Sequence, residues 1–317
     1  MSAKVSAVVV GCGRMGAGAT DSHAAAFAKH PKTVLAGLSD VNADAMRAAG
    51  ERFAVTTAAD AVSLCRDVKP SIVSIAASTA THADIALAIL KAAPPKCLFI
   101  EKPLARTGRE ARAVVEMAKN AGVSVCVNYS RRFAPAYQAL ARELQSGALG
   151  TPRRVHVTYG KGLGNNGSHA IDLLRMLLGE PRSAAGKVAT WAMPGPDDDA
   201  TYDAELLFEG DVRVAFSSFD ENLASVWEVD LFTTTARIRA TLGGRTIEHF
   251  ERRTGAVSAG YAHYVATGRI ETDVLASALD EAVGAIATHV QNGAPLPCTG
   301  DDGLAALQWV ERIKENA

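Results

Sequence analysis

The stretch NNGSHAID at residues 165–172 combines a histidine with amide, hydroxyl and carboxylate side chains just before an apolar run. Because imidazole titrates near neutral pH, His169 is suited to take a proton from a substrate hydroxyl. Asp172 follows three residues later, so the two side chains share a helix face on which Asp172 can orient the ring. Alternatively, Ser168 or Asn166 caps a helix and His169 is a first-turn residue without chemistry. These residues alone leave both interpretations open.

A glycine-rich segment, VVVGCGRMG, follows a β-branched run and precedes a helical pattern. Its glycines allow a tight turn and let the backbone approach a pyrophosphate, although they could serve the turn alone. A second run ends in Asp40, whose carboxylate can accept hydrogen bonds from the adenosine ribose and would repel a 2′-phosphate. We therefore predict a dinucleotide site that favours NAD, with NADP possible. Its residues in the turn are Gly11, Gly13, Arg14, Met15 and Gly16.

Polar residues also follow the later β-branched runs, where a doubly wound sheet binds its ligands. Lys102 could hold a developing alkoxide if it is partly desolvated, or it could be a solvated loop charge. His82 follows Thr79 by three residues, so it fits a helix cap as readily as a cofactor contact. We also assign the following residues to the cofactor site: Ser78, Thr79, His82, Glu101, Lys102 and Asn128.

These residues require an alternating α/β scaffold. Short β-branched runs at 5–10, 33–40, 71–77, 97–101 and 123–128 alternate with alanine-rich helical patterns, which predicts a parallel sheet covered by helices. After Pro135 the sequence becomes rich in runs with a period of two, as in an antiparallel sheet with one covered face. We predict a Rossmann domain over 1–127 and an α+β domain with a large, mostly antiparallel sheet over 128–317. The acidic stretch PGPDDD at 194–199 is interpreted as a solvated turn.

Composition narrows the class of partner. With 33 Lys and Arg against 34 Asp and Glu, no basic surface for nucleic acid or for a membrane is expected, which favours a small-molecule partner. The N-terminal apolar run is too short for a signal peptide, and the five cysteines are scattered, so we expect a cytoplasmic protein with reduced thiols. None of the histidines at 156, 249, 263 and 289 has a second His, Cys or Asp at metal-ligand spacing, and no metal is predicted.

Motifs in nearly the whole chain occur in an order shared with one family. They are VVVGCGRMG (8–16), SIAASTATHADIA (74–86), IEKPLA (100–105), NYSRRFAP (128–135) and GSHAIDLLRMLLGEP (167–181). This combination resembles the glucose-fructose oxidoreductase, inositol dehydrogenase and MocA (Gfo/Idh/MocA) family of oxidoreductases. The resemblance implies NAD or NADP and hydride transfer involving a secondary hydroxyl or ketone of a sugar, cyclitol or sugar derivative. It also implies a homo-oligomer, a dimer or tetramer, formed through the large sheet.

The resemblance further implies residue roles. Lys102 maps to the family's lysine near the reacting carbon, often next to a cis peptide bond, here Lys102–Pro103. His169 maps to the acid/base, so the two form the expected catalytic pair. Asn165 takes the place of a family aspartate, and its amide can neither carry a negative charge nor take a proton. The expected catalytic residues are Lys102, His169, Asn165 and Asp172, and the expected substrate contacts are Lys102, Tyr129, Arg132, Asn165 and His169.

Two rival functions remain. A glycosidase of the same family would oxidise its substrate transiently with tightly held NAD. A sensing relative would bind dinucleotide or sugar without catalysis, as Asn165 suggests.

Overall fold

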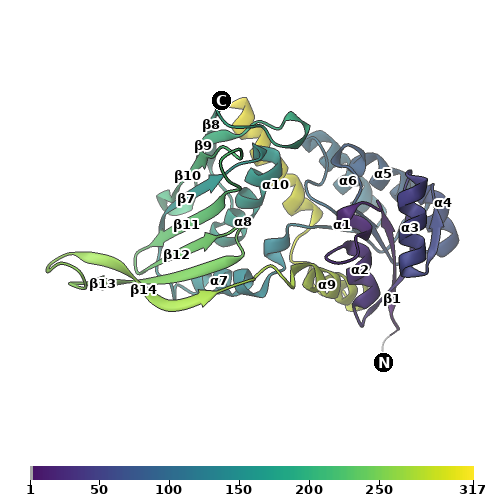
Figure 1. Ribbon diagram of the computed structural model, residues 1–317, viewed down its shortest axis with the longest axis horizontal. Helices are drawn as coiled ribbons and strands as arrows, with labels where there is room; N and C mark the ends of the chain where they lie inside the picture. Colours follow the sequence, from purple (N-terminus) through teal and green to yellow (C-terminus); the bar gives the residue numbers. More distant parts are fainter. Residues whose placement is uncertain (1–2) are drawn as a thin grey trace. The chain divides into compact units, whose positions relative to one another are not determined.

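The computed structural model describes residues 3–317, which form two compact units that we describe separately (Figure 1). The first unit comprises Met1–Phe133 and Ser277–Leu307, and the second comprises Ala134–Ala276 and Gln308–Ala317. Residues 128–133 and 277–307 thus pack with the first unit, whereas the sequence prediction assigned them to the second domain. The helix at 278–292 contacts two strands of the first sheet, which explains its place there.

The first unit contains a six-stranded parallel sheet in the order β3-β2-β1-β4-β5-β6, the arrangement of a Rossmann domain. Its strands are β1 (Val5–Val10), β2 (Thr33–Ser39), β3 (Thr56–Ala58), β4 (Ile72–Ile75), β5 (Cys97–Ile100) and β6 (Ser124–Val127). Its helices include α1 (Arg14–Ala17), α2 (His23–Lys29), α3 (Ala43–Phe53), α4 (Ala61–Val68), α5 (His82–Ala92), α6 (Gly108–Asn120) and α9 (Ala278–Asn292). The short β3 has no β-branched aliphatic residue and was not predicted.

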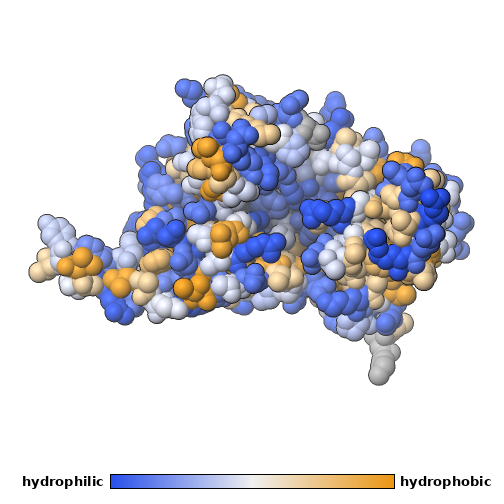
Figure 2. All heavy atoms as spheres, viewed as in Figure 1, coloured by the Kyte–Doolittle hydropathy of each residue, from blue (hydrophilic) through white to orange (hydrophobic). Residues whose placement is uncertain are grey.

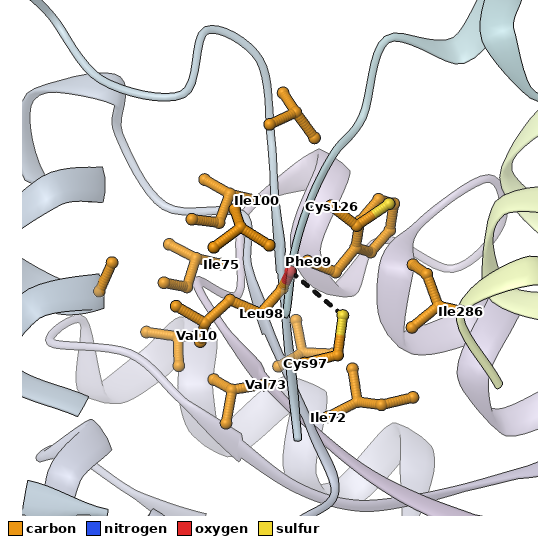
Figure 3. Close-up of a cluster of buried hydrophobic side chains, with 14 of the residues drawn as sticks. Val10, Ile72, Val73, Ile75, Cys97, Leu98, Phe99, Ile100, Cys126 and Ile286 are labelled. Carbon is orange, nitrogen blue, oxygen red and sulfur yellow. Dashed lines mark hydrogen bonds between the residues drawn. The ribbon is translucent and has the colours of Figure 1, made fainter. Parts of the chain in front are cut away.

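Buried aliphatic and aromatic side chains of the central strands fill the core of this unit (Figure 3). Phe99 and Ile100 of β5 are fully buried, as is Ile286 of α9. Because helices cover both faces of a parallel sheet, its central strands β4 and β5 are buried along their whole length and do not alternate. All five cysteines are free and buried, as the sequence predicted. Burial raises the pKa of the Cys97 thiol to about 12.

The second unit contains an eight-stranded sheet in the order β14-β13-β12-β11-β7-β10-β9-β8. Only the β7–β10 pair is parallel among these ladders, so the mostly antiparallel prediction is confirmed. Alternating burial along β11 and β12 shows one covered face. The strands are β7 (Pro152–Tyr159), β8 (Ser183–Val188), β9 (Tyr202–Leu207), β10 (Arg213–Ser218), β11 (Trp227–Thr233), β12 (Ala236–Thr241), β13 (Thr246–Thr254) and β14 (Ala262–Glu271).

Helices α7 (Pro135–Gln145) and α8 (Ser168–Leu178) contact each other in this unit. The final helix, α10 (Gly300–Glu315), contributes its residues from 308 onward. The β13–β14 hairpin extends beyond the rest of its sheet (Figure 1). None of the helices in the described part of the chain is long and apolar enough to cross a membrane.

Candidate functional site

The glycine turn after β1 has the space that a dinucleotide needs. Gly11 has φ +102°, and a Cβ there would lie 2.5 Å from the Ala76 carbonyl oxygen. A Cβ on Gly16 would overlap the Gly11 carbonyl, whereas one on Gly13 would meet nothing within 4 Å. Gly11 and Gly16 therefore permit close backbone packing, and Gly13 leaves room for a pyrophosphate.

The helix that follows this turn is short. α1 contains only Arg14–Ala17, and the chain then forms a loop before Ser22 caps α2 by accepting a hydrogen bond from the Ala25 N–H. This loop and α2 separate the glycine turn from β2, which Asp40 follows. Because α1 is a single turn, the backbone N–H groups of the turn matter more than a helix dipole.

Asp40 is anchored to the glycine turn. Its Oδ2 accepts a hydrogen bond from the Cys12 N–H at 2.5 Å, and its Oδ1 accepts one from the Asn42 N–H at 2.7 Å. Burial, followed by the nearby charge of Asp40, raises the pKa of the Cys12 thiol to about 11, so this cysteine stays protonated. The ribose-binding candidate and the phosphate-binding turn thus form one local structure.

A buried hydrogen-bond network surrounds Glu101 at the end of β5. His23 is fully buried, and its Nε2 lies 2.7 Å from Glu101 Oε1 while its Nδ1 lies 2.6 Å from Ser74 Oγ. The ring stacks on Phe99 with centroids 4.7 Å apart. Sequence reasoning did not single out His23. Its position immediately after the cap Ser22, at the start of an alanine-rich buried helix, is the signal that could have found it.

Asn128 joins the same network from the end of β6. Its Nδ2 donates to Glu101 Oε1 at 2.6 Å. Burial would raise the pKa of Glu101, but the hydrogen bond and charge of His23, the Asn128 bond and the charge of Lys102 together hold this pKa below its usual value. The Asn128 Oδ1 atom is buried and has no hydrogen-bond partner among the described residues, so it is an available acceptor.

Lys102 follows Glu101, and this carboxylate fixes the Lys102 backbone. The Lys102 N–H donates to Glu101 Oε2 at 3.2 Å, and the Lys102–Pro103 peptide bond is cis, as predicted. His82 Nδ1 lies 2.9 Å from the Pro103 carbonyl and its Nε2 lies 3.1 Å from the Ala77 carbonyl. Burial lowers the pKa of His82, so the ring is neutral and donates to one of these carbonyls.

The remaining candidates of the first unit differ in their exposure. Ser78 is exposed and precedes the 3-10 helix η1 (Thr79–Thr81), where no side chain caps the helix, so the cap considered for His82 is absent. Tyr129 is 1% exposed. Arg132 is also buried, and its Nη1 lies 3.2 Å from Asp302 Oδ1 in the same unit. This ion pair gives Arg132 a structural partner, whereas the sequence analysis expected a substrate contact.

In the second unit, Asn165 lies in a π-helical turn, η3 (Gly162–Gly167), that leads directly into α8. The Ser168 N–H donates to the Leu163 carbonyl, and Ser168 Oγ donates to the Asn165 carbonyl at 3.1 Å. The N-cap of α8 is Gly167, without a side-chain hydrogen bond. The predicted cap by Ser168 or Asn166 is therefore wrong, because the preceding helical turn already supplies acceptors for the first N–H groups of α8.

His169 is partly exposed in the first turn of α8, and Asp172 is 1% exposed. Asp172 Oδ1 lies 3.6 Å from Arg175 Nη1, and Arg175 in turn forms hydrogen bonds with Glu180 at 2.5–3.0 Å. These contacts give Asp172 a structural partner on its own helix. Within the described residues, no cluster of three His, Cys, Asp or Glu side chains could hold a metal ion.

The comparison with protein families finds a match within the first unit. Residues 5–129 match the Gfo/Idh/MocA family, described as an oxidoreductase family with an NAD-binding Rossmann fold. Over these residues the chain resembles that family. The predicted resemblance is thus confirmed over residues 5–129, the strand order confirms the Rossmann fold, and the family description supports the predicted NAD-type cofactor.

Curated relatives match about half of the chain. Inositol 2-dehydrogenase 2 of Saccharopolyspora erythraea is 31% identical over 193 residues, which cover 54% of this chain and 53% of the relative. Levoglucosan dehydrogenase of Pseudarthrobacter phenanthrenivorans is 28% identical over 190 residues, which cover 53% and 48%. The chain spans about half the length of the curated relatives it matches.

Solved structures extend the likeness in fold to the whole chain. Levoglucosan dehydrogenase in complex with NADH and L-sorbose superposes with a TM-score of 0.83 at 19% identity, covering 100% of this chain and 97% of that chain. UDP-N-acetylglucosamine 3-dehydrogenase of Acidithiobacillus ferrooxidans gives 0.77 at 19% identity, covering 100% and 98%. At these identities the likeness shows the fold alone.

Proposed function

We propose that this protein is an NAD-dependent dehydrogenase that acts on a secondary hydroxyl of a sugar or cyclitol. The glycine turn carries the proposal, because Gly11 and Gly16 exclude side chains while Gly13 borders open space. The free acceptor Asn128 Oδ1 and the anchored Asp40 also fit a dinucleotide. Relatives named for inositol and levoglucosan support the substrate class.

Each catalytic role is proposed from the chemistry of one side chain. When bound, NAD accepts the hydride from the carbinol carbon. A ring nitrogen of His169 takes the hydroxyl proton as the carbonyl forms, and the Lys102 ammonium stabilises negative charge on the reacting oxygen. Asn165 donates or accepts a hydrogen bond at a substrate hydroxyl but transfers no proton. Asp172 supports the helix that presents His169.

A substrate screen tests the proposed activity. Inositols, hexoses, uronates and amino sugars are each incubated with the protein and NAD, and NADH is followed by its absorbance. Net accumulation of NADH with at least one compound is the expected result. Glycoside cleavage with copurified NAD and no net NADH would instead support the glycosidase, and NAD binding without turnover of any compound would support the sensor.

The preference for NAD is tested at Asp40. Its carboxylate would repel a 2′-phosphate, so Asp40→Ser should raise the use of NADP relative to NAD by roughly tenfold, the effect of about 1.4 kcal/mol. Kinetics with both cofactors provide the measurement. A wild-type enzyme that reduces NADP alone would contradict the proposed role of Asp40.

The proposed assembly is a homo-oligomer, a dimer or tetramer. Its support is the large sheet, whose β13–β14 hairpin carries exposed Val257 and Tyr261 at its end, where Figure 2 shows apolar surface. Light scattering on the purified protein should give at least twice the chain mass.

The cytoplasmic location also remains a proposal, supported by the five free, buried thiols.

A further inference from the structure

Asp199 contacts the segment that precedes His169, although the sequence suggested only a solvated turn there. Asp199 Oδ2 accepts a hydrogen bond from the Asn165 N–H at 2.8 Å, and Oδ1 lies 2.9 Å from Lys314 Nζ. The Asp199 side chain is only 14% exposed. It follows the 3-10 helix η4 (Pro196–Asp198), and all of these residues belong to the second unit.

The backbone of η3 is shaped to receive this carboxylate. A Cβ on Gly162 would overlap Asp199, and one on Gly164 would lie 3.2 Å from Asp199 Oδ2. Gly162 also has φ +86°, a conformation that disfavours other residues. Two neighbouring bonds hold the same segments together, from the Leu163 N–H to the Ala200 carbonyl at 2.9 Å and from the Gly162 N–H to Thr201 Oγ1 at 3.0 Å.

We propose that Asp199 is a positioning residue for the dehydrogenase reaction. It fixes the backbone at Asn165, and the π-helical turn transmits this constraint to the start of α8, where His169 lies. Lys314 near the end of α10 holds the other carboxylate oxygen and sets the orientation of Asp199. The inference rests on the proposed function, because it has Asp199 orient two residues of that function. These are the acid/base His169 and Asn165, whose side-chain amide contacts the substrate.

Removing the Asp199 carboxylate, which accepts the Asn165 hydrogen bond, should lower kcat while the melting temperature changes little. In Asp199→Ala, loss of the bond to Asn165 should lower kcat about 10–100-fold, since small displacements of a catalytic group have effects of this size. NAD affinity and the melting temperature should stay close to wild type, because the two neighbouring bonds remain. Asp199→Asn keeps an acceptor oxygen and should recover most of kcat. Asp198→Asn removes one negative charge from an exposed neighbour and is the matched control.

Amide hydrogen exchange of the full-length protein with NAD supplies a readout that is independent of turnover. Residues 162–169 should exchange faster in Asp199→Ala than in wild type or Asp198→Asn. Wild-type kcat or unchanged exchange in Asp199→Ala would overturn the inference, as would equal losses in the Asn and Ala variants. If the wild type oxidises no compound in the screen, the proposed function fails, whereas the exchange result still decides whether Asp199 fixes this segment.

Discussion

Glu101 and Asp199 both anchor a backbone segment that carries a proposed catalytic residue, and their side chains are similarly exposed, at 13% and 14%. Their partners differ. Glu101 contacts the fully buried His23 and the buried Asn128, whereas Asp199 contacts an N–H group and Lys314, which is 39% exposed. A network of buried partners is strong and cooperative, while an exposed ion pair contributes little to stability. The Glu101 network should therefore support folding and catalysis, and the Asp199 contact mainly catalysis.

The largest expected effect is at the residue that the Glu101 network holds. Lys102→Met should lower kcat about 10²–10⁴-fold, because the charge that stabilises the reacting oxygen is lost. Lys96→Met is the control, since Lys96 is exposed just before β5 and Lys102 follows that strand. Comparable losses in both variants would contradict a specific role for Lys102.

His169 provides the corresponding test in the second unit. His169→Asn should lower kcat about 10²-fold by removing the proton acceptor, and added imidazole should restore part of the activity. His156→Asn changes an exposed histidine on β7 and should leave kcat unchanged. Steady-state kinetics with and without imidazole make the measurement. Full activity of His169→Asn would contradict its role as the acid/base.

A stability measurement sharpens the comparison directly. Glu101→Gln should lower the free energy of unfolding by roughly 1–3 kcal/mol, because buried partners lose a charged acceptor. Lys314→Met should lower it by less than about 1 kcal/mol, as expected for an exposed pair. Denaturant unfolding at neutral pH gives both values. A larger loss of unfolding free energy in Lys314→Met than in Glu101→Gln would contradict this comparison.

The smallest expected effect is the loss of folding stability at acidic pH. The pKa values of Glu101 and His82 are both lower in the folded protein, so the unfolded chain binds more protons as pH falls. The contribution of His82 to the free energy of unfolding should therefore be fully present above its unfolded pKa of about 6.5. It should be lost as the pH falls from that value through the lower pKa of His82 in the folded protein. His82→Gln should flatten the first part of this decline. An identical pH dependence in the variant would exclude His82 as a contributor.

Features that depend on local chemistry and hydrophobic period could be predicted from the sequence. The apolar runs and the glycine motif predicted the Rossmann sheet, whereas the cis bond before Pro103 was expected only from the family resemblance. Partners that are distant in the chain could not be predicted in this way. His23 meets Glu101 across 78 positions, and Asp199 meets Asn165 across 34, so neither contact leaves a short-range pattern. The helix cap was misjudged because a π-helical turn has no simple sequence signal.

The most direct test of the proposed hydride transfer follows the hydrogen itself. A substrate from the screen is labelled with deuterium at the secondary carbinol carbon, and NADH is analysed by mass spectrometry after single-turnover oxidation. We predict that NADH carries the deuterium in the wild type and that labelled NADH fails to form at the wild-type rate in Lys102→Met. Product formation without deuterium in NADH would contradict hydride transfer to NAD and with it the proposed function.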